Sequence, residues 1–143
     1  MKVKEIMTHQ PVYGTPDTSI HVIAQLMAEN DCGCIPIVAS EEVHYPIGVV
    51  TDRDIVLRTV ALNNNPLNYK AADIMTNTIF TTTPETALEE CCRLMETHQI
   101  RRLAVVDPNG ALCGMISQAD IATHAPPEKT AEVVQVVSKT AER

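Results

Sequence analysis

The hydrophobic residues of the chain form two series that run in the same order. Each series begins with apolar residues three and four positions apart, the spacing that places side chains on one face of an amphipathic helix. Two short apolar runs and a second helical segment follow. The helix-spaced residues are Ile20, Ile23, Ala24 and Met27 in the first series and Leu88, Cys91, Cys92 and Met95 in the second. The pattern predicts helices that end near Asn30 and His98.

The short apolar runs predict strands. They lie at 35–38 and 47–50 in the first series and at 103–106 and 113–116 in the second. Val12 and Phe80 are predicted to lie on a short first strand that precedes each helix. Each series therefore reads strand, helix, strand, strand, helix, which predicts an α+β fold.

Two signals predict where the helices begin. Thr15 and Thr83 each precede a proline, and these residue types are favoured at the N-cap and the first helical position. The second helix of each series is predicted to begin at Thr51 and at Ser117, directly after a predicted strand.

The two series are copies of one sequence. Ile6-Met7-Thr8 recurs 68 residues later as Ile74-Met75-Thr76, and residues 48–55 match residues 114–121 at a spacing of 66. A copy of about 60 residues is marginally stable alone, because a domain of that size buries a smaller fraction of its surface than a larger domain does. We therefore predict two β-α-β-β-α repeats that pack on a common core with pseudo-two-fold symmetry.

The repeats set the expected domain boundaries. The first repeat is predicted at 1–62, a linker at 63–70 and the second repeat at 71–124. Residues 125–143 form a tail in which Val133, Val134 and Val137 recur at helical spacing. The tail is expected to be either a short amphipathic helix or a frayed terminus.

Composition narrows the class of protein. The 143 residues carry a formal net charge of -7, which disfavours a nucleic-acid binder, because such proteins present a basic face. The longest strictly apolar run, at 103–106, is far shorter than the ~20 residues of a membrane-spanning helix. The start of the chain has no apolar signal segment, and the five cysteines are an odd number without the spacing of a disulfide framework. We expect a cytoplasmic protein with reduced thiols.

Several motifs recur in order in both repeats, and together they carry a family resemblance. They are Asp73-Ile74-Met75-Thr76, the Thr-Pro-x-Thr segment, Ile100-Arg101-Arg102-Leu103-Ala104-Val105-Val106-Asp107, and a glycine followed by Thr/Ser-x-x-Asp-Ile. Over about residues 1–124 the chain resembles a pair of cystathionine-β-synthase (CBS) domains. The resemblance implies a regulatory module that binds AMP, ADP, ATP or S-adenosylmethionine in clefts between the repeats. It also implies a homodimer that requires no cofactor and acts on a regulated protein partner.

Thr51 and Asp54, with their counterparts Ser117 and Asp120, are the first candidate ligand-binding residues. A Thr-x-x-Asp sequence at a helix start ordinarily forms a capping box, in which each side chain bonds the backbone of the other residue. The family resemblance implies that the hydroxyl contacts a phosphate and the carboxylate the ribose hydroxyls. Both interpretations hold together if the cap faces a cleft.

Arg101 and Arg102 precede a strand of the second repeat, where the resemblance implies phosphate contacts. Adjacent arginines are otherwise commonly a solvated edge. The matching residues of the first repeat are Gly33 and Cys34, which carry no charge. This asymmetry predicts that one site handles phosphates better than the other or that one site stays empty, unless another cation of the first repeat substitutes. The candidates for that substitution are Arg53, Arg58 and Lys70.

Adenine is expected to rest against apolar residues and backbone. The candidates include Thr15 and Thr83, at the ends of the segments before the first helices, and Ile35 and Leu103 on the following strands. For the aliphatic residues, a simple core role is the competing interpretation.

Three other functions compete with a nucleotide sensor. The first is an oligomerisation or interaction scaffold with vestigial sites. The second is a thiol or metal sensor built on Cys32, Cys34, Cys91 and Cys92, although their spacing matches neither a zinc knuckle nor a redox motif. The third is an enzyme, and the sequence presents no nucleophile beside a base and no acid pair. We expect no catalytic activity and no metal site.

Overall fold

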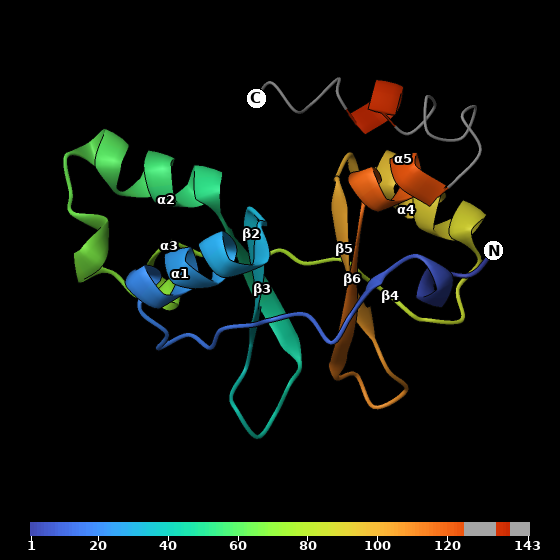
Figure 1. The fold of residues 1–143 in the computed structure, drawn as a ribbon, viewed down its shortest axis with the longest axis horizontal. Coiled ribbons are helices and arrows are strands. Elements are labelled where there is room, and N and C mark those ends of the chain that lie inside the picture. The colour runs from blue at the N-terminus through green and yellow to red at the C-terminus, as the bar shows by residue number, and fades with distance from the viewer. Residues whose placement is uncertain (125–133, 138–143) are drawn as a thin grey trace. The chain divides into compact units, whose positions relative to one another are not determined.

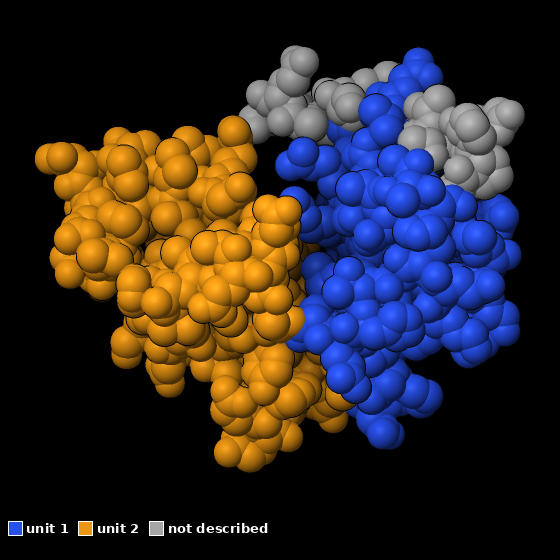
Figure 2. All heavy atoms as spheres, in the orientation of Figure 1, with its two compact units in different colours: residues 1–11, 80–109, 113–143 blue, residues 12–79, 110–112 orange. Residues whose placement is uncertain are grey.

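The computed structural model describes residues 1–124 and 134–137, which divide into two compact units (Figures 1 and 2). Unit 2 comprises Val12–Ile79 and Gly110–Leu112, and unit 1 comprises Met1–Pro11, Phe80–Asn109 and the chain from Cys113. The units therefore do not coincide with the two sequence repeats. The chain's first eleven residues belong to the unit that holds most of the second repeat.

Unit 2 contains a two-stranded antiparallel hairpin and the helices that adjoin it. Its helices are α1 (Ile20–Asn30), α2 (Asp52–Arg58) and α3 (Ala71–Ile74), with 3-10 turns η2 (Val60–Leu62) and η3 (Pro66–Asn68). Its strands are β2 (Cys34–Val38) and β3 (Pro46–Thr51). Cys34 lies opposite Thr51, so the start of β2 adjoins the point where β3 ends and α2 begins.

Unit 1 contains a four-stranded sheet in the order β1-β6-β5-β4. Its elements are η1 (Val3–Glu5), β1 (Thr8–His9), β4 (Thr81–Thr82), α4 (Leu88–His98), β5 (Arg102–Val106), β6 (Leu112–Ser117) and α5 (Gln118–His124). β1 runs antiparallel to β6, and β4 runs parallel to β5. Residues 134–137 are helical, whereas Val133 of the predicted tail helix lies outside the described residues.

The leading segment of each repeat pairs with the third strand of the other repeat. Thr8 lies opposite Met115 on β6, and Thr76 forms a bridge with Val49 on β3. The Val49 and Thr76 backbones exchange two hydrogen bonds, of 3.0 and 2.8 Å. This exchange explains why the compact units differ from the sequence repeats.

Each unit has its own aliphatic core. The core of unit 2 includes Ile20, Ile23, Ile35, Ile37, Val50 and Ile74, and the core of unit 1 includes Val3, Leu88, Met95, Leu103, Val105, Ile116, Ile121 and Val137. β3 and β6 have the same alternation of buried and half-buried residues, as expected for strands with one face on a core. No helix of the described residues has the length and apolar character needed to cross a bilayer.

The α+β class, the predicted hairpin strands and the ends of the first helices at Asn30 and His98 are confirmed. The predicted helix starts at Thr15 and Thr83 are wrong, because α1 and α4 begin at Ile20 and Leu88. Each Thr-Pro-x-Thr segment instead forms a turn, in which the backbone N–H of the fourth residue donates to the carbonyl of the first. Val12 and Phe80 lie just outside the predicted first strands: Val12 falls between β1 and the bridge of Gly14 with Ile37, and Phe80 directly precedes β4, with its carbonyl accepting the Ala104 N–H at 3.2 Å.

Candidate functional site

Thr51 and Asp54 form a capping box at the start of α2. The Asp54 backbone N–H donates to Thr51 Oγ1 at 3.0 Å, and the Thr51 N–H donates to Asp54 Oδ2 at 3.0 Å. The predicted cap is therefore confirmed. The Asp54 side chain is 12 % exposed, so its carboxylate depends on fixed partners more than a solvated one does.

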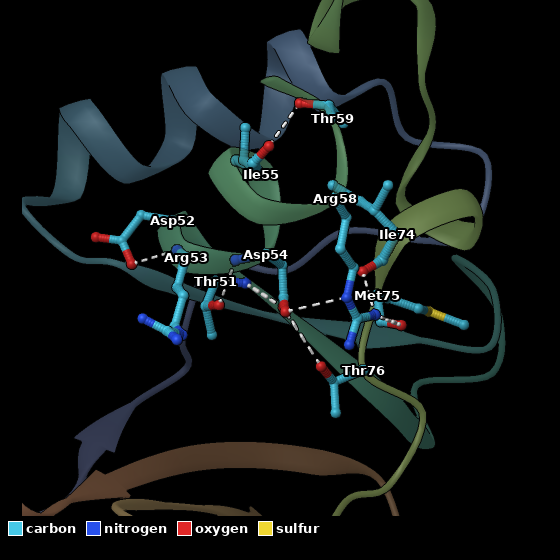
Figure 3. Close-up of polar contacts among 10 residues, drawn as sticks. All are labelled: Thr51, Asp52, Arg53, Asp54, Ile55, Arg58, Thr59, Ile74, Met75 and Thr76. Atoms are coloured by element: carbon cyan, nitrogen blue, oxygen red, sulfur yellow. Dashed lines mark hydrogen bonds and ion pairs between the residues drawn. The ribbon is translucent and has the colours of Figure 1, made fainter. Parts of the chain in front are cut away.

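Two further side chains hold the Asp54 carboxylate (Figure 3). The Thr76 hydroxyl donates to it at 3.4 Å, and Arg58 Nε lies 3.7 Å from Oδ1. Arg58 Nη1 also donates to the backbone carbonyls of Ile74 and Met75, at 2.9 and 3.1 Å. Arg58, the last residue of α2, therefore links the Asp54 carboxylate to the end of α3. Thr76, in the segment after α3, donates to the same carboxylate.

Arg58→Gln is expected to lower the free energy of unfolding by about 1 kcal/mol, because it removes charge-assisted hydrogen bonds that are partly exposed to solvent. Arg53→Gln is the matched control, since Arg53 makes the same charge change on the same helix. Its side chain is exposed and forms no hydrogen bond or ion pair with described residues. Urea unfolding followed by circular dichroism measures both variants. Equal losses would show that the contacts of Arg58 contribute nothing to stability.

Ser117 and Asp120 form the equivalent pair at the start of α5. The Ser117 N–H and hydroxyl both donate to Asp120 Oδ2, at 2.8 and 3.0 Å, and the Asp120 N–H donates to Ser117 Oγ at 3.1 Å. The residue that matches Arg58 is His124, whose ring bonds the backbone carbonyl of Asp120 rather than its carboxylate. Asp120 Oδ1 thus accepts no hydrogen bond from the described residues.

Arg101 adjoins this second capping box. The Gln118 N–H donates to the Arg101 carbonyl at 2.7 Å, so Arg101 lies beside the residue that follows Ser117. Arg101 is exposed, and Arg102, the first residue of β5, is half-buried. Neither side chain forms a hydrogen bond or ion pair with described residues. Gln118 Oε1 is buried and has no hydrogen-bond partner in the described part of the chain.

The matching corner of unit 2 presents the carboxylate of Asp52. The Asp52 N–H donates to the Gly33 carbonyl at 3.0 Å, which is the same backbone contact. The Asp52 carboxylate lies against Gly33, with Oδ2 only 2.8 Å from the point where a Cβ on Gly33 would sit. Gly33 therefore has no room for a side chain while Asp52 keeps this position.

The remaining predicted ligand-binding residues are Thr15, Thr83, Ile35 and Leu103, and they differ in burial. Thr15 is half-buried in unit 2, and Thr83 is exposed in unit 1. Ile35 and Leu103 are at most 1 % exposed and belong to the two cores. Their contact with a ligand stays a prediction, whereas their part in the core is observed.

Sequence reasoning missed Thr76, Asp52 and Gln118 as members of these corners. Thr76 lies in the repeated Ile-Met-Thr segment, so the repeat itself was the available signal. Asp52 and Gln118 each lie two residues before the aspartate of the capping box, and their difference in charge gains meaning only beside Gly33 and Arg101.

The cysteines give little support to a thiol or metal sensor. All five lie in the described residues, and none forms a disulfide. Burial, with a smaller effect of Cys92, raises the pKa of Cys91 to about 12, which keeps this thiol protonated and unreactive at neutral pH. Within residues 1–124 and 134–137, no three His, Cys, Asp or Glu side chains are grouped so as to hold a metal ion.

Comparisons with known proteins agree with the repeat and with the fold. The family model described as CBS domain matches residues 3–60 and 71–126. The chain is 34 % identical over 121 residues to an uncharacterized protein, MK0525, from Methanopyrus kandleri. The match covers 85 % of this chain but only 61 % of that longer protein. It is 35 % identical over 122 residues to the CBS domain-containing protein YhcV from Bacillus subtilis, covering 85 % of this chain and 84 % of YhcV.

A solved structure extends the comparison. The CBS domain protein PAE2072 from Pyrobaculum aerophilum, complexed with AMP, is 27 % identical and superposes with a TM-score of 0.77. The match covers 94 % of this chain and 99 % of that one. Two matches to one family model, in a chain with two sequence repeats, account for nearly the whole described structure. The chain belongs to the CBS domain family and carries two CBS repeats in tandem.

Proposed function

We propose that the protein is a regulatory module that binds an adenine nucleotide or a related adenosyl ligand and catalyses no reaction of its own. The observation that carries the proposal is the pair of capping boxes, Thr51–Asp54 and Ser117–Asp120, each placed where a strand passes into a helix. The AMP held by PAE2072, a relative that matches over nearly the full length, supports adenine nucleotides as the ligand class.

The chemistry of the capping boxes suits a nucleoside. A carboxylate accepts up to four hydrogen bonds, so it has capacity for both ribose hydroxyls beyond its contacts with the cap. In Asp120 both cap contacts go to Oδ2, which leaves Oδ1 for a hydroxyl donor. The Thr51 and Ser117 hydroxyls stand beside these carboxylates and offer further polar contact to the same ligand.

The proposed output is a change in conformation or assembly that a partner protein reads. A ligand shifts such an equilibrium only by as much as it prefers one state over the other. A cytoplasmic homodimer and a regulated protein partner stay predictions. Exposed apolar side chains support an interface of this kind. On unit 2 they include Val56, Leu57, Val60, Leu62 and Leu67, which are 45–64 % exposed.

AMP is expected to raise the melting temperature of the full chain. At about 100 times its dissociation constant, a ligand that binds only the folded state adds roughly 2.7 kcal/mol to the free energy of unfolding. A thermal-shift panel of AMP, ADP, ATP and S-adenosylmethionine, followed by calorimetry, measures the effect. Inosine monophosphate serves as the ligand control, because it changes the base alone.

The variants Asp54→Asn and Asp120→Asn distinguish this function from a scaffold with vestigial sites. Asparagine keeps an oxygen acceptor for the cap but loses the charge that strengthens hydrogen bonds from ribose. The double variant is expected to keep its fold and lose the AMP-induced shift. A flat panel with the unaltered chain would contradict the proposal and favour the scaffold.

A further inference from the structure

We propose that the loop joining β2 to β3 is a docking surface for a partner protein, and that it binds a segment of that partner which carries arginine. The loop comprises residues 39–45, and its exposed side chains Glu42, Val43 and Tyr45 form the surface. The inference rests on the proposed function only for the existence of a partner, and it adds the chemistry of that partner. The observation that carries it is an aromatic ring, packed on one side and exposed on the other, near an unpaired carboxylate.

The 39–45 loop lies at the end of the hairpin away from the capping box of α2 (Figure 1). β3 runs from Pro46, where the loop ends, to Thr51, where α2 begins, so the full length of the strand separates the two. The matching loop of the second repeat, at 107–111, is two residues shorter. The first repeat therefore carries an extension at a place that the ligand site does not use.

Hydrogen bonds hold the 39–45 loop in one conformation. The Ser40 N–H donates to the Val43 carbonyl at 3.0 Å, and the Val43 N–H donates to Ser40 Oγ at 2.9 Å. The His44 carbonyl accepts the Leu112 N–H at 2.8 Å, and His44 Nε2 bonds the Glu41 carbonyl at 2.7 Å. A preformed surface of this kind loses little conformational entropy when a partner binds, which favours affinity.

Tyr45 gives the loop an exposed aromatic ring. The ring packs against Gly110, with Cε1 3.4 Å from the point where a Cβ on that glycine would sit, yet Tyr45 is 52 % exposed. Val43 is 42 % exposed, and the Tyr13 ring lies 4.8 Å from the His44 ring. Two of the three tyrosines of a chain without Trp therefore lie at this loop. Tyrosine is enriched at protein interfaces, because its ring covers a large area with few rotatable bonds.

The charge of the loop indicates which partner it fits. Residues 39–46 include Glu41 and Glu42 but no lysine or arginine. Glu41 Oε2 accepts a hydrogen bond from the Tyr13 hydroxyl at 2.8 Å, and this neutral donor leaves the negative charge uncompensated. Glu42 is exposed and has no hydrogen-bond or ion-pair partner in the described part of the chain. A guanidinium group suits both features of the surface, since it pairs with carboxylates and stacks on aromatic rings.

Titration of the full chain with tetra-arginine, acetylated and amidated at its ends, tests the inference. Tetra-lysine with the same ends carries the same charge and is the ligand control. In NMR spectra of the labelled chain, we expect amide shifts confined to residues 40–45 and 110–112. Tetra-arginine is expected to bind about threefold more tightly than tetra-lysine, because guanidinium stacks better on a ring. Shifts spread over other acidic surfaces, or equal affinities for the two peptides, would overturn the inference.

Ring variants identify the contribution of Tyr45. Tyr45→Ala is expected to weaken tetra-arginine binding about threefold, as the loss of a cation–π contact at an exposed site predicts. Tyr45→Phe keeps the ring and is expected to bind within about twofold of the unaltered chain. The matched control is Leu62→Ala, which removes a side chain that is 64 % exposed on η2 of the same unit. A loss for Tyr45→Ala no larger than that for Leu62→Ala would contradict the proposed role of the ring.

Charge variants identify the contribution of Glu42. Glu42→Gln is expected to weaken tetra-arginine binding about threefold, within the range for an exposed ion pair. Glu29→Gln makes the same charge change at an exposed residue of α1 in the same unit, and it is expected to have no more than a small effect. Equal losses for the two variants would show that the peptide responds to net charge alone, which would overturn the inference.

Two further measurements separate this inference from its alternatives. Tyr45→Ala is expected to keep the sedimentation behaviour of the unaltered chain. Conversion to a smaller species would assign the loop to an interface between copies of this chain and overturn the inference. An AMP-induced rise in melting temperature without peptide binding would overturn the inference and leave the proposed ligand binding standing. Localised peptide binding without that rise would support the docking surface and contradict the proposed ligand binding.

Discussion

Gly48→Ala is expected to lower the free energy of unfolding by about 3 kcal/mol, at the upper end of the range for overpacking. A Cβ at this position would lie 2.6 Å from the carbonyl oxygen of Thr76. That oxygen accepts a hydrogen bond from the Val49 N–H, so it cannot move without breaking the bridge between β3 and the segment after α3. The added methyl group therefore separates two backbones that must pair.

Gly114→Ala is the matched control, since Gly114 occupies the same position in the second repeat. Its Cβ would lie 2.6 Å from Met7 Sδ and 3.0 Å from the Thr8 carbonyl oxygen. The thioether lies near the end of a flexible side chain and can rotate away, so we expect a loss of only about 1 kcal/mol. Urea unfolding followed at 222 nm compares the two variants. If both variants lost the same free energy of unfolding, the Thr76 backbone would move away from the added methyl group as readily as the Met7 side chain does.

Leu103→Ala is expected to lower the free energy of unfolding by about 3 kcal/mol, because it leaves a cavity in the core of unit 1. Leu103 is 1 % exposed and packs in the same core as Val105, Ile116 and Ile121. The control is Leu67→Ala, the same substitution at a residue that is 62 % exposed, with an expected change below about 0.5 kcal/mol. Thermal and urea unfolding measure both.

This comparison also tests the earlier interpretation of Leu103 as an adenine contact. A residue whose main role is in the core affects stability in the absence of ligand, whereas a residue that only lines a ligand site does not. A stability of Leu103→Ala equal to that of the unaltered chain would contradict its assignment to the core.

The local features of the fold were predictable from the sequence. The ends of α1 and α4 and the positions of β2, β3, β5 and β6 follow from hydrophobic spacing and turn residues. The capping boxes were predictable for the same reason, since Thr51 and Asp54 are three residues apart and each bonds the other's backbone. Contacts of this kind depend on a few neighbouring residues.

The features that the sequence did not predict depend on distant segments. The first N–H of α1, on Ile20, donates to the Tyr69 carbonyl, and that of α4, on Leu88, donates to the Met1 carbonyl. α1 also has a local cap, since Ser19 Oγ accepts a hydrogen bond from the Val22 N–H at 3.2 Å, whereas α4 begins after Ala87 without a side-chain cap. Arg58 was visible as a cation near Asp54, but its carbonyl partners on Ile74 and Met75 lie 16 and 17 residues away. Hydrogen bonds between segments so far apart in the sequence produce no periodic pattern of hydrophobic residues from which they could be predicted.

The exchange of leading segments has a consequence for how such a chain can originate. A single repeat translated alone would carry a leading segment without a third strand to pair with, and a third strand without its neighbour. Both are completed when two such chains donate their leading segments to each other. Tandem duplication of the gene would join those two partners through a short linker and replace an encounter in solution by an intramolecular one at high effective concentration. Fusion of this kind stabilises a dimer's contacts at any expression level, and afterwards leaves the two repeats free to diverge in sequence.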